Sequence, residues 1–139
     1  MKPLPAIVLV HCMAALTMAA PILAPFPASA AVAPEFYAAA RDRAPEVIVF
    51  DVTGVTPAKG PGPGWCHVAA HITAVERGQR YKPGQRIKVP VHCFYPGQAV
   101  PNGGALYVPI ADLTASKQGR AFMESGYPVL DQYDILPAK

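Results

Sequence analysis

The chain has 139 residues and a formal net charge of +3, so its overall electrostatics are mild, which excludes a strongly basic or acidic protein. Removal of the N-terminal leader described next would leave 109 residues, the size of one compact domain with one core. The three cysteines would then become two, an even number that favours one disulfide in an oxidising compartment.

Residues 1–30 have the pattern of a secretory signal peptide. One lysine is their only charge, an apolar run covers residues 6–23, and residues 28–30 form an A-x-A cleavage site. The alternative, a membrane anchor, requires about 18 or more unbroken apolar residues, and Pro21 interrupts this run. We therefore expect an exported protein, periplasmic or secreted, whose mature domain comprises residues 31–139 and has no membrane span.

Residues 34–43 predict a short helix. Pro34 suits the first helical turn, an acidic residue follows it, and basic residues lie at the end, which is the charge order that a helix dipole favours. Phe36 and Ala40 are expected on the buried side, and Pro45 ends the helix.

Residues 46–55 are rich in β-branched and aromatic side chains and predict a central strand covered on both faces. Asp51 is the one charge inside this run, and it is either a ligand or acid–base group or an outward-facing or paired carboxylate. The proline- and glycine-rich residues 56–65 predict a surface loop. Trp65, the sole tryptophan, is either an exposed recognition side chain or a core side chain packed on the disulfide.

Residues 66–93 predict one long β-hairpin closed by a disulfide between Cys66 and Cys93, which contributes about 3 kcal/mol by the chain-entropy estimate. The corresponding register forms three apolar pairs on the inner face: Val68 with Val91, Ala70 with Val89, and Ile72 with Ile87. On the other face it pairs His67 with His92 and His71 with Lys88. Pro90 has no N–H to donate, so this register requires an unpaired outer side of the second strand, unless a bulge shifts it.

The C-terminal part predicts three more elements. Residues 104–110 form a short fourth strand, residues 113–124 a helix capped by Asp112, and residues 128–136 a fifth strand. Gly119 weakens the helix prediction.

Basic residues gather on the hairpin and its tip. With Tyr81 beside them, they are the candidate ligand-binding residues: Arg77, Arg80, Lys82, Arg86 and Lys88. Such a patch suits an anionic partner, for example nucleic acid, lipid headgroups or an acidic glycan, although no specific nucleic-acid motif is present. The alternative is a solvated turn whose cations discourage strand-to-strand aggregation.

No catalytic constellation is evident. Ser116 and Ser125 are the serines of the mature chain and neither lies in a G-x-S-x-G elbow, and the chain has no Walker loop or H-E-x-x-H motif. Oxidation of Cys66 and Cys93 leaves no free thiol as a nucleophile. We therefore expect a protein that is not an enzyme and needs no cofactor.

A metal site is an alternative function centred on His67 and His92. Opposed residues on one face of an antiparallel pair have Cβ atoms about 5 Å apart, close enough to share one metal ion. A third ligand would come from Asp51, Tyr95 or a loop. The other interpretation is a surface histidine pair beside a disulfide.

The hairpin resembles the central hairpin of netrin-like modules, the OB-type barrels of tissue inhibitors of metalloproteinases and complement proteins. The resemblance covers residues 46–110 and is carried by the strand VIVFDVTGV, the turn VERG, the tripeptide KPG and the strand IKV. It implies the fold and no functional residue, because those inhibitors act through an N-terminal cysteine and the expected N-terminus here is Ala31.

Together these features predict a mainly β protein: a small five-stranded OB-like, netrin-like barrel with one or two short helices and one disulfide. We expect a non-catalytic binding or interaction module of the cell envelope, with an anionic ligand or a protein partner on the face of the 66–93 hairpin. Two alternatives are a metal-binding envelope protein and a protease-inhibitor-like module.

Overall fold

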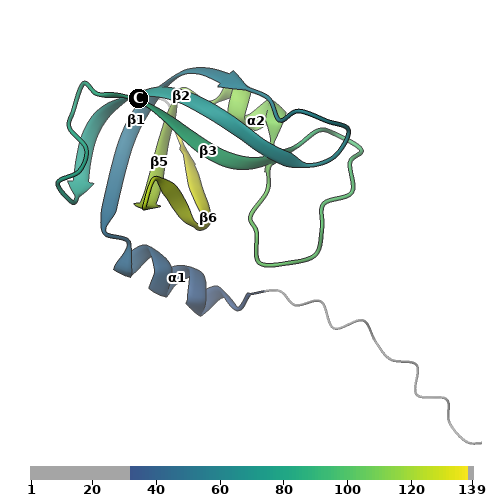
Figure 1. Ribbon diagram of the computed structural model, residues 1–139, viewed down its shortest axis with the longest axis horizontal. Helices are drawn as coiled ribbons and strands as arrows, with labels where there is room; N and C mark the ends of the chain where they lie inside the picture. The colour runs from purple at the N-terminus through teal and green to yellow at the C-terminus, as the bar shows by residue number, and fades with distance from the viewer. Residues whose placement is uncertain (1–31, 138–139) are drawn as a thin grey trace, which may run out of the picture.

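The computed structural model describes residues 32–137, so the predicted signal peptide lies outside the described part of the chain. The elements in order are α1 (Pro34–Arg43), β1 (Glu46–Thr56), β2 (Gly64–Arg77), β3 (Arg86–Phe94), β4 (Val108–Pro109), α2 (Ile110–Ala115), β5 (Gln118–Glu124) and β6 (Tyr127–Leu136). All strands belong to one sheet with the order β4-β3-β2-β1-β5-β6. The sheet curls into an open half-barrel, with α1 below it (Figure 1).

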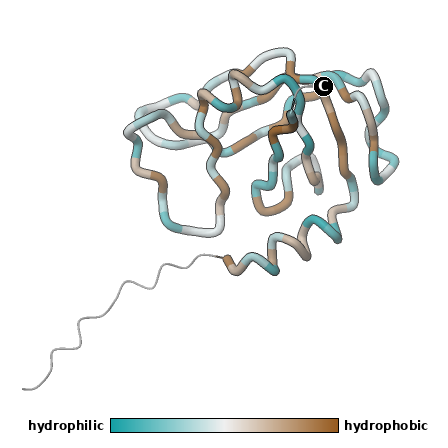
Figure 2. The backbone as a smooth tube through the Cα atoms, turned by 180° about the vertical axis from the view of Figure 1, so that it is seen from behind, coloured by the Kyte–Doolittle hydropathy of each residue, from teal (hydrophilic) through white to brown (hydrophobic). Residues whose placement is uncertain are grey.

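The mainly β class, the presence of two short helices and the disulfide agree with the prediction, but the strand count does not. The sheet has six strands where five were predicted, and the barrel is not closed by a continuous ladder. β3 and β6 nevertheless lie against each other at the open side. The core therefore lies inside the curl, and Figure 2 shows hydrophobic residues gathered along the strands.

Helix α1 has the predicted bounds but not the predicted buried face. None of its residues is buried, and Phe36 is 59% exposed. The helix is held to β6 by polar contacts instead: the Arg41 guanidinium binds Asp134 at 2.8 and 3.0 Å, and buried Gln132 donates from Nε2 to the Tyr37 carbonyl at 3.0 Å. Because these contacts fix the helix without an apolar stripe, Phe36 remains at the surface.

The β2–β3 pairing differs from the predicted register by two residues. Cys66 pairs with Val91 and Val68 with Val89, so Cys66 and Cys93 are diagonal neighbours with a Cα–Cα distance of 5.8 Å. A shift of two residues leaves every inward side chain inward, so the hydrophobic pattern alone cannot exclude it. The observed register goes with the turn at the hairpin tip. Gly84, at φ +81°, turns the chain there so that its N–H bonds to the Ile72 carbonyl.

The chain between residues 113 and 124 is mostly strand, where a helix was predicted. Helix α2 ends at Ala115, and in β5 the buried residues Gly119, Ala121 and Met123 alternate with less buried neighbours. This period of two is a strand signal. The predicted strand over residues 104–110 is reduced to the two residues of β4, which pair in parallel with the end of β3.

Strand β6 contains a bulge where it meets β3. Its register on β5 jumps between Ala121 and Met123, and within the extra residues Leu130 and Asp131 have φ values of +46° and +57°. Positive φ is uncommon for a non-glycine residue and is unusual for leucine. The bulge turns Asp131 toward β3, where its carboxylate meets His92.

Tyr133 carries a buried phenol in the core. Burial raises its pKa above the usual 10.0, partly offset by the nearby Ser116 hydroxyl. That hydroxyl itself donates to the Leu113 carbonyl at 2.7 Å, and among residues 32–137 the Tyr133 hydroxyl has no aligned hydrogen-bond partner. Below pH 10 the phenol is neutral in the folded and in the unfolded protein. Above pH 10 the phenol of the unfolded chain ionises first, because its pKa is the lower of the two. The free energy of unfolding therefore falls as the pH rises through the raised pKa of the folded protein.

Tyr133→Phe should therefore reduce the alkaline loss of stability. At neutral pH the free energy of unfolding should change by less than about 1 kcal/mol, because the lost hydroxyl has no partner. Urea unfolding from about pH 9 to about pH 11 should show a steeper decline for the wild type than for the variant. Parallel declines would contradict this assignment.

Neither helix of residues 32–137 is long and apolar enough to cross a membrane.

Candidate ligand-binding face

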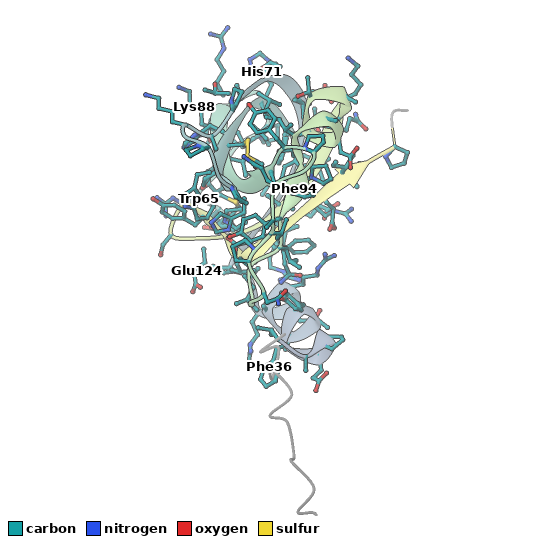
Figure 3. All side chains as sticks on the ribbon, turned by 90° about the vertical axis from the view of Figure 1, so that its right-hand side faces the viewer. Phe36, Trp65, His71, Lys88, Phe94 and Glu124 are labelled. Carbon is teal, nitrogen blue, oxygen red and sulfur yellow. A yellow bond between two sulfur atoms is a disulfide. The ribbon has the colours of Figure 1, made fainter. Side chains whose placement is uncertain are left out.

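The outward side chains of β2 and β3 form the candidate site. Along residues 65–72 of β2, buried side chains alternate with more exposed ones. The register sets each outward residue of β2 beside one of β3: His71 with Arg86, Ala69 with Lys88, His67 with Pro90, and Trp65 with His92. We call this surface the outer face of β2–β3. Figure 3 shows His71 and Lys88 at one end of the molecule and Trp65 farther along it.

One end of the outer face contains a groove of about 540 Å³, which we call the basic groove. Its lining consists of Thr53, Ala69, Ala70, His71, Arg86, Ile87 and Lys88. Thr53 reaches it from β1 because the β1–β2 register shifts between Val52 and Gly54, which makes Thr53 the extra residue. Arg86 donates from Nε to His71 Nε2 at 3.1 Å, so its guanidinium is oriented while further N–H donors remain for a ligand.

The basic groove is cationic. Arg86 and Lys88 are exposed, neither forms an ion pair within residues 32–137, and no carboxylate lines the groove. Asp51 faces His71 from β1, but its carboxylate accepts a hydrogen bond from Gln118 Nε2 at 2.9 Å. Asp51 is exposed, so of its two predicted roles the structure supports the outward-facing carboxylate.

Arg77 lies far from the groove and has a structural contact. Its Nη1 donates to the carbonyls of Arg41, Asp42 and Ala44 at 2.9 to 3.0 Å. These carbonyls end helix α1, whose last acceptors have no partner inside the helix. Arg77 therefore joins the end of β2 to α1.

The other predicted binding residues occupy the hairpin tip. Arg80 and Lys82 are exposed there, and the Glu46 carboxylate accepts a hydrogen bond from the Arg80 backbone N–H at 3.2 Å. Tyr81 is half-buried and packs against the core. None of the three lines the groove, so Arg86 and Lys88 are the predicted residues that the structure brings together with His71.

The opposite end of the outer face carries an aromatic cluster of Trp65, His92, Tyr107 and Tyr127. The rings of Trp65 and His92 are stacked with centroids 3.6 Å apart, and those of His92 and Tyr107 with centroids 5.0 Å apart. Tyr127 meets Trp65 edge-on at 6.2 Å. Trp65 is 40% exposed and Tyr127 is 59% exposed, so Trp65 is an exposed side chain and not the core residue that one prediction offered.

The disulfide lies directly behind this cluster. Cys66 and Cys93 are bonded, as predicted, and both are fully buried. Each follows its aromatic neighbour in the chain, Trp65 or His92, and points to the opposite side of the sheet. The covalent link between β2 and β3 therefore also holds the two stacked rings in place.

Asp131 adds a carboxylate to the cluster. Its Oδ1 lies 3.1 Å from His92 Nδ1, within ion-pair range when His92 is protonated, although the two atoms lack hydrogen-bond geometry. The positive φ values of Leu130 and Asp131 are the strained backbone that brings the carboxylate there. Such strain is often found at functional sites.

His67 and His92, the predicted metal ligands, are not opposed. His67 pairs with Pro90, and His92 is stacked between Trp65 and Tyr107. Within residues 32–137, no group of three or more His, Cys, Asp or Glu side chains is placed to hold a metal ion. The opposed pairing from which the metal prediction was argued is therefore replaced by a different arrangement.

Several site residues could not be found from the sequence. Thr53 enters through a bulge, whereas Tyr107 comes from the loop before β4, and Tyr127 and Asp131 come from β6. The curled sheet brings these two segments to His92 and Trp65. A single tyrosine in a loop or at a strand end, and an aspartate in a bulge, carry no periodic signal. The turn sequence Ser125-Gly126 before Tyr127 indicates a hairpin, and this was the one available hint.

Comparisons of the chain with protein-family models, with curated proteins and with solved structures find no match.

Proposed function

We propose that this chain is an exported, non-catalytic binding module that holds an anionic ligand on the outer face of β2–β3. The observation that carries the proposal is the basic groove, in which Arg86 and Lys88 are exposed and, in the part of the chain that the structure describes, no carboxylate contributes to the lining. Clustered cations at a concave surface attract and hold anions, because the low-dielectric walls focus their field. Arg86 supplies directional donors and Lys88 a mobile point charge.

The topology supports an OB-like architecture for this module. The sheet contains the consecutive order β3-β2-β1-β5-β6, and β3 lies against β6. In the chain, α2 falls between β3 and β5. A five-stranded, partly open barrel of this kind binds ligands on the face of its second and third strands. The netrin-like resemblance adds only this fold to the proposal.

The disulfide supports export. Structural disulfides persist in oxidising compartments and are rare in the cytosol. The Cys66–Cys93 bond is fully buried and joins two central strands, which suits a structural role. A periplasmic or secreted location is therefore part of the proposal.

Tripolyphosphate, a small polyanion without rings, tests the groove. Calorimetric titration at low salt should show binding to the wild type, weakened by added salt. The Arg86→Glu/Lys88→Glu double variant should bind at least about tenfold more weakly, because two attractions become repulsions.

The matched control is Arg43→Glu/Lys117→Glu, which makes the same change in net charge at exposed residues on α1 and before β5. It should bind nearly as well as the wild type. Equal losses in both double variants would mean that only net charge matters, and would overturn the assignment of the groove.

A further inference from the structure

The basic groove and the aromatic cluster lie at the two ends of one row of outward residues on β2 and β3, which we call the track. Along β2, outward residues run from His71 to Trp65, and along β3 from Arg86 to His92, without a register shift between the two strands. Six residue steps of extended strand span about 20 Å. Between the two ends lie the partly exposed Ala69, the exposed His67 and the buried Pro90. A ligand on this track is elongated, with an anionic group at one end and a flat apolar surface at the other.

The aromatic end is preorganised. Trp65 is stacked on His92 at 3.6 Å and braced edge-on by Tyr127, so its rotamer is held before a ligand arrives. Its 40% exposure leaves part of the indole open to solvent. The electron-rich face of an indole attracts the weakly positive C–H groups on the apolar side of a sugar ring. Holding the side chain in advance reduces the entropy lost on binding.

The charges around the aromatic end select among ring-bearing anions. Asp131 contacts His92, and Glu124 pairs with Tyr127 across β5 and β6. Carboxylates repel the regularly spaced phosphates of a nucleic acid but accept hydrogen bonds from hydroxyl groups. The track also offers two exposed cations, Arg86 and Lys88, at one end only. Nucleic-acid binding relies on cations along the whole backbone path.

We infer that the outer face of β2–β3 binds an acidic oligosaccharide, with a carboxylate or sulfate in the basic groove and a sugar ring against Trp65. This inference rests on the proposed function and names its ligand class. Asp131 and Glu124 accept hydrogen bonds from the sugar hydroxyls, while Arg86 and Lys88 bind the anionic group.

The fluorescence of Trp65 provides a direct test, because it is the sole tryptophan of the chain. Titration with a galactose trisaccharide that carries one terminal galacturonic acid should give a saturable change in emission, and the same trisaccharide with a terminal galactose 6-sulfate tests sulfate in place of carboxylate. Binding of either supports the inference. The neutral methyl ester of the first oligosaccharide and tetrathymidylate should each bind at least about tenfold more weakly than the better acidic sugar.

Variants separate this inference from the proposed function. By calorimetry, Trp65→Ala and Tyr127→Ala should each weaken acidic sugar binding by up to about tenfold and leave tripolyphosphate binding unchanged. Ile135→Ala is the control, since Ile135 is 40% exposed like Trp65 but lies at the other end of β6 from Tyr127. Tyr127→Ala keeps the test valid if Trp65→Ala fails to fold.

Two failures are distinguishable. In the first, tripolyphosphate binding depends on Arg86 and Lys88, but sugar binding is unaffected by Trp65→Ala and Tyr127→Ala or is weaker than tetrathymidylate binding. That result overturns only the oligosaccharide inference. If neither tripolyphosphate nor an acidic sugar needs Arg86 and Lys88, the proposed function fails as well.

Discussion

Replacing Cys66 and Cys93 together with alanine should lower the free energy of unfolding by about 3 to 4 kcal/mol. The bond closes a chain segment with a sequence separation of 27, and the loss reflects the larger conformational entropy of the open unfolded chain. Both side chains are fully buried, so alanine avoids leaving a buried hydroxyl in the core, as serine would. Urea unfolding of the oxidised wild type and the double variant measures the difference.

The control is the wild type unfolded under reducing conditions, which should be destabilised by a similar amount. The emission of Trp65 should also change in the folded double variant, because the bond behind the aromatic cluster no longer ties β2 to β3. A double variant as stable as the oxidised wild type would show that the strand pairing and core alone set the stability.

Gly119→Ala should destabilise the fold by about 1 to 3 kcal/mol. A Cβ atom at this position would lie 2.7 Å from both Phe50 Cε2 and the Tyr133 hydroxyl, nearer than side chains pack. Phe50 is completely buried and Tyr133 nearly so, and the surrounding core gives them little room to move. The substitution therefore forces these two rings apart at the centre of the barrel.

Gly54→Ala is the matched control, since Gly54 also lies in a strand and an added Cβ there meets nothing within 4 Å. This variant should change stability by less than about 1 kcal/mol. Thermal unfolding of the two single variants beside the wild type gives the comparison. If both alanines prove equally tolerated, Phe50 and Tyr133 do not pack on β5 as described.

The first half of the fold was predictable from local patterns. Residues 34–43 have helix-end charges in the right order, and residues 66–93 alternate so regularly that their inner face follows from sequence. Their register did not follow, because a slip of two residues keeps the same face buried. The observed pairing is the one in which the turn places the Gly84 N–H on the Ile72 carbonyl and the Ile72 N–H on the Gln85 carbonyl.

The second half was harder to predict for two physical reasons. β5 buries Gly119 and Ala121, whose small side chains give a weak alternation signal, so the sequence does not separate a strand there from a helix with a poor apolar face. β6 is interrupted by the Leu130–Asp131 bulge, whose positive φ values could not be predicted from the sequence Leu-Asp. Asp131 reaches His92 through that bulge.

One part of the candidate site could likewise be predicted from the sequence and the other could not. Arg86 and Lys88 were identified because consecutive outward positions of one strand are visible in sequence. The aromatic cluster was not, because its members come from β2, β3, β6 and the segment before β4. Phe36 shows the converse error: an aromatic residue on a helix was expected inside, yet the polar contacts of Arg41 and Gln132 hold α1 in its place.

The most direct test of the binding face is an NMR titration of the isotope-labelled protein with tripolyphosphate. We expect the largest amide shifts at residues 69–71 of β2 and 86–88 of β3, next to the basic groove. In the Arg86→Glu/Lys88→Glu variant these shifts should disappear. Shifts concentrated elsewhere, for example on α1 and β6, or an unchanged pattern in the variant, would contradict the assignment of the outer face of β2–β3 as the anion-binding surface.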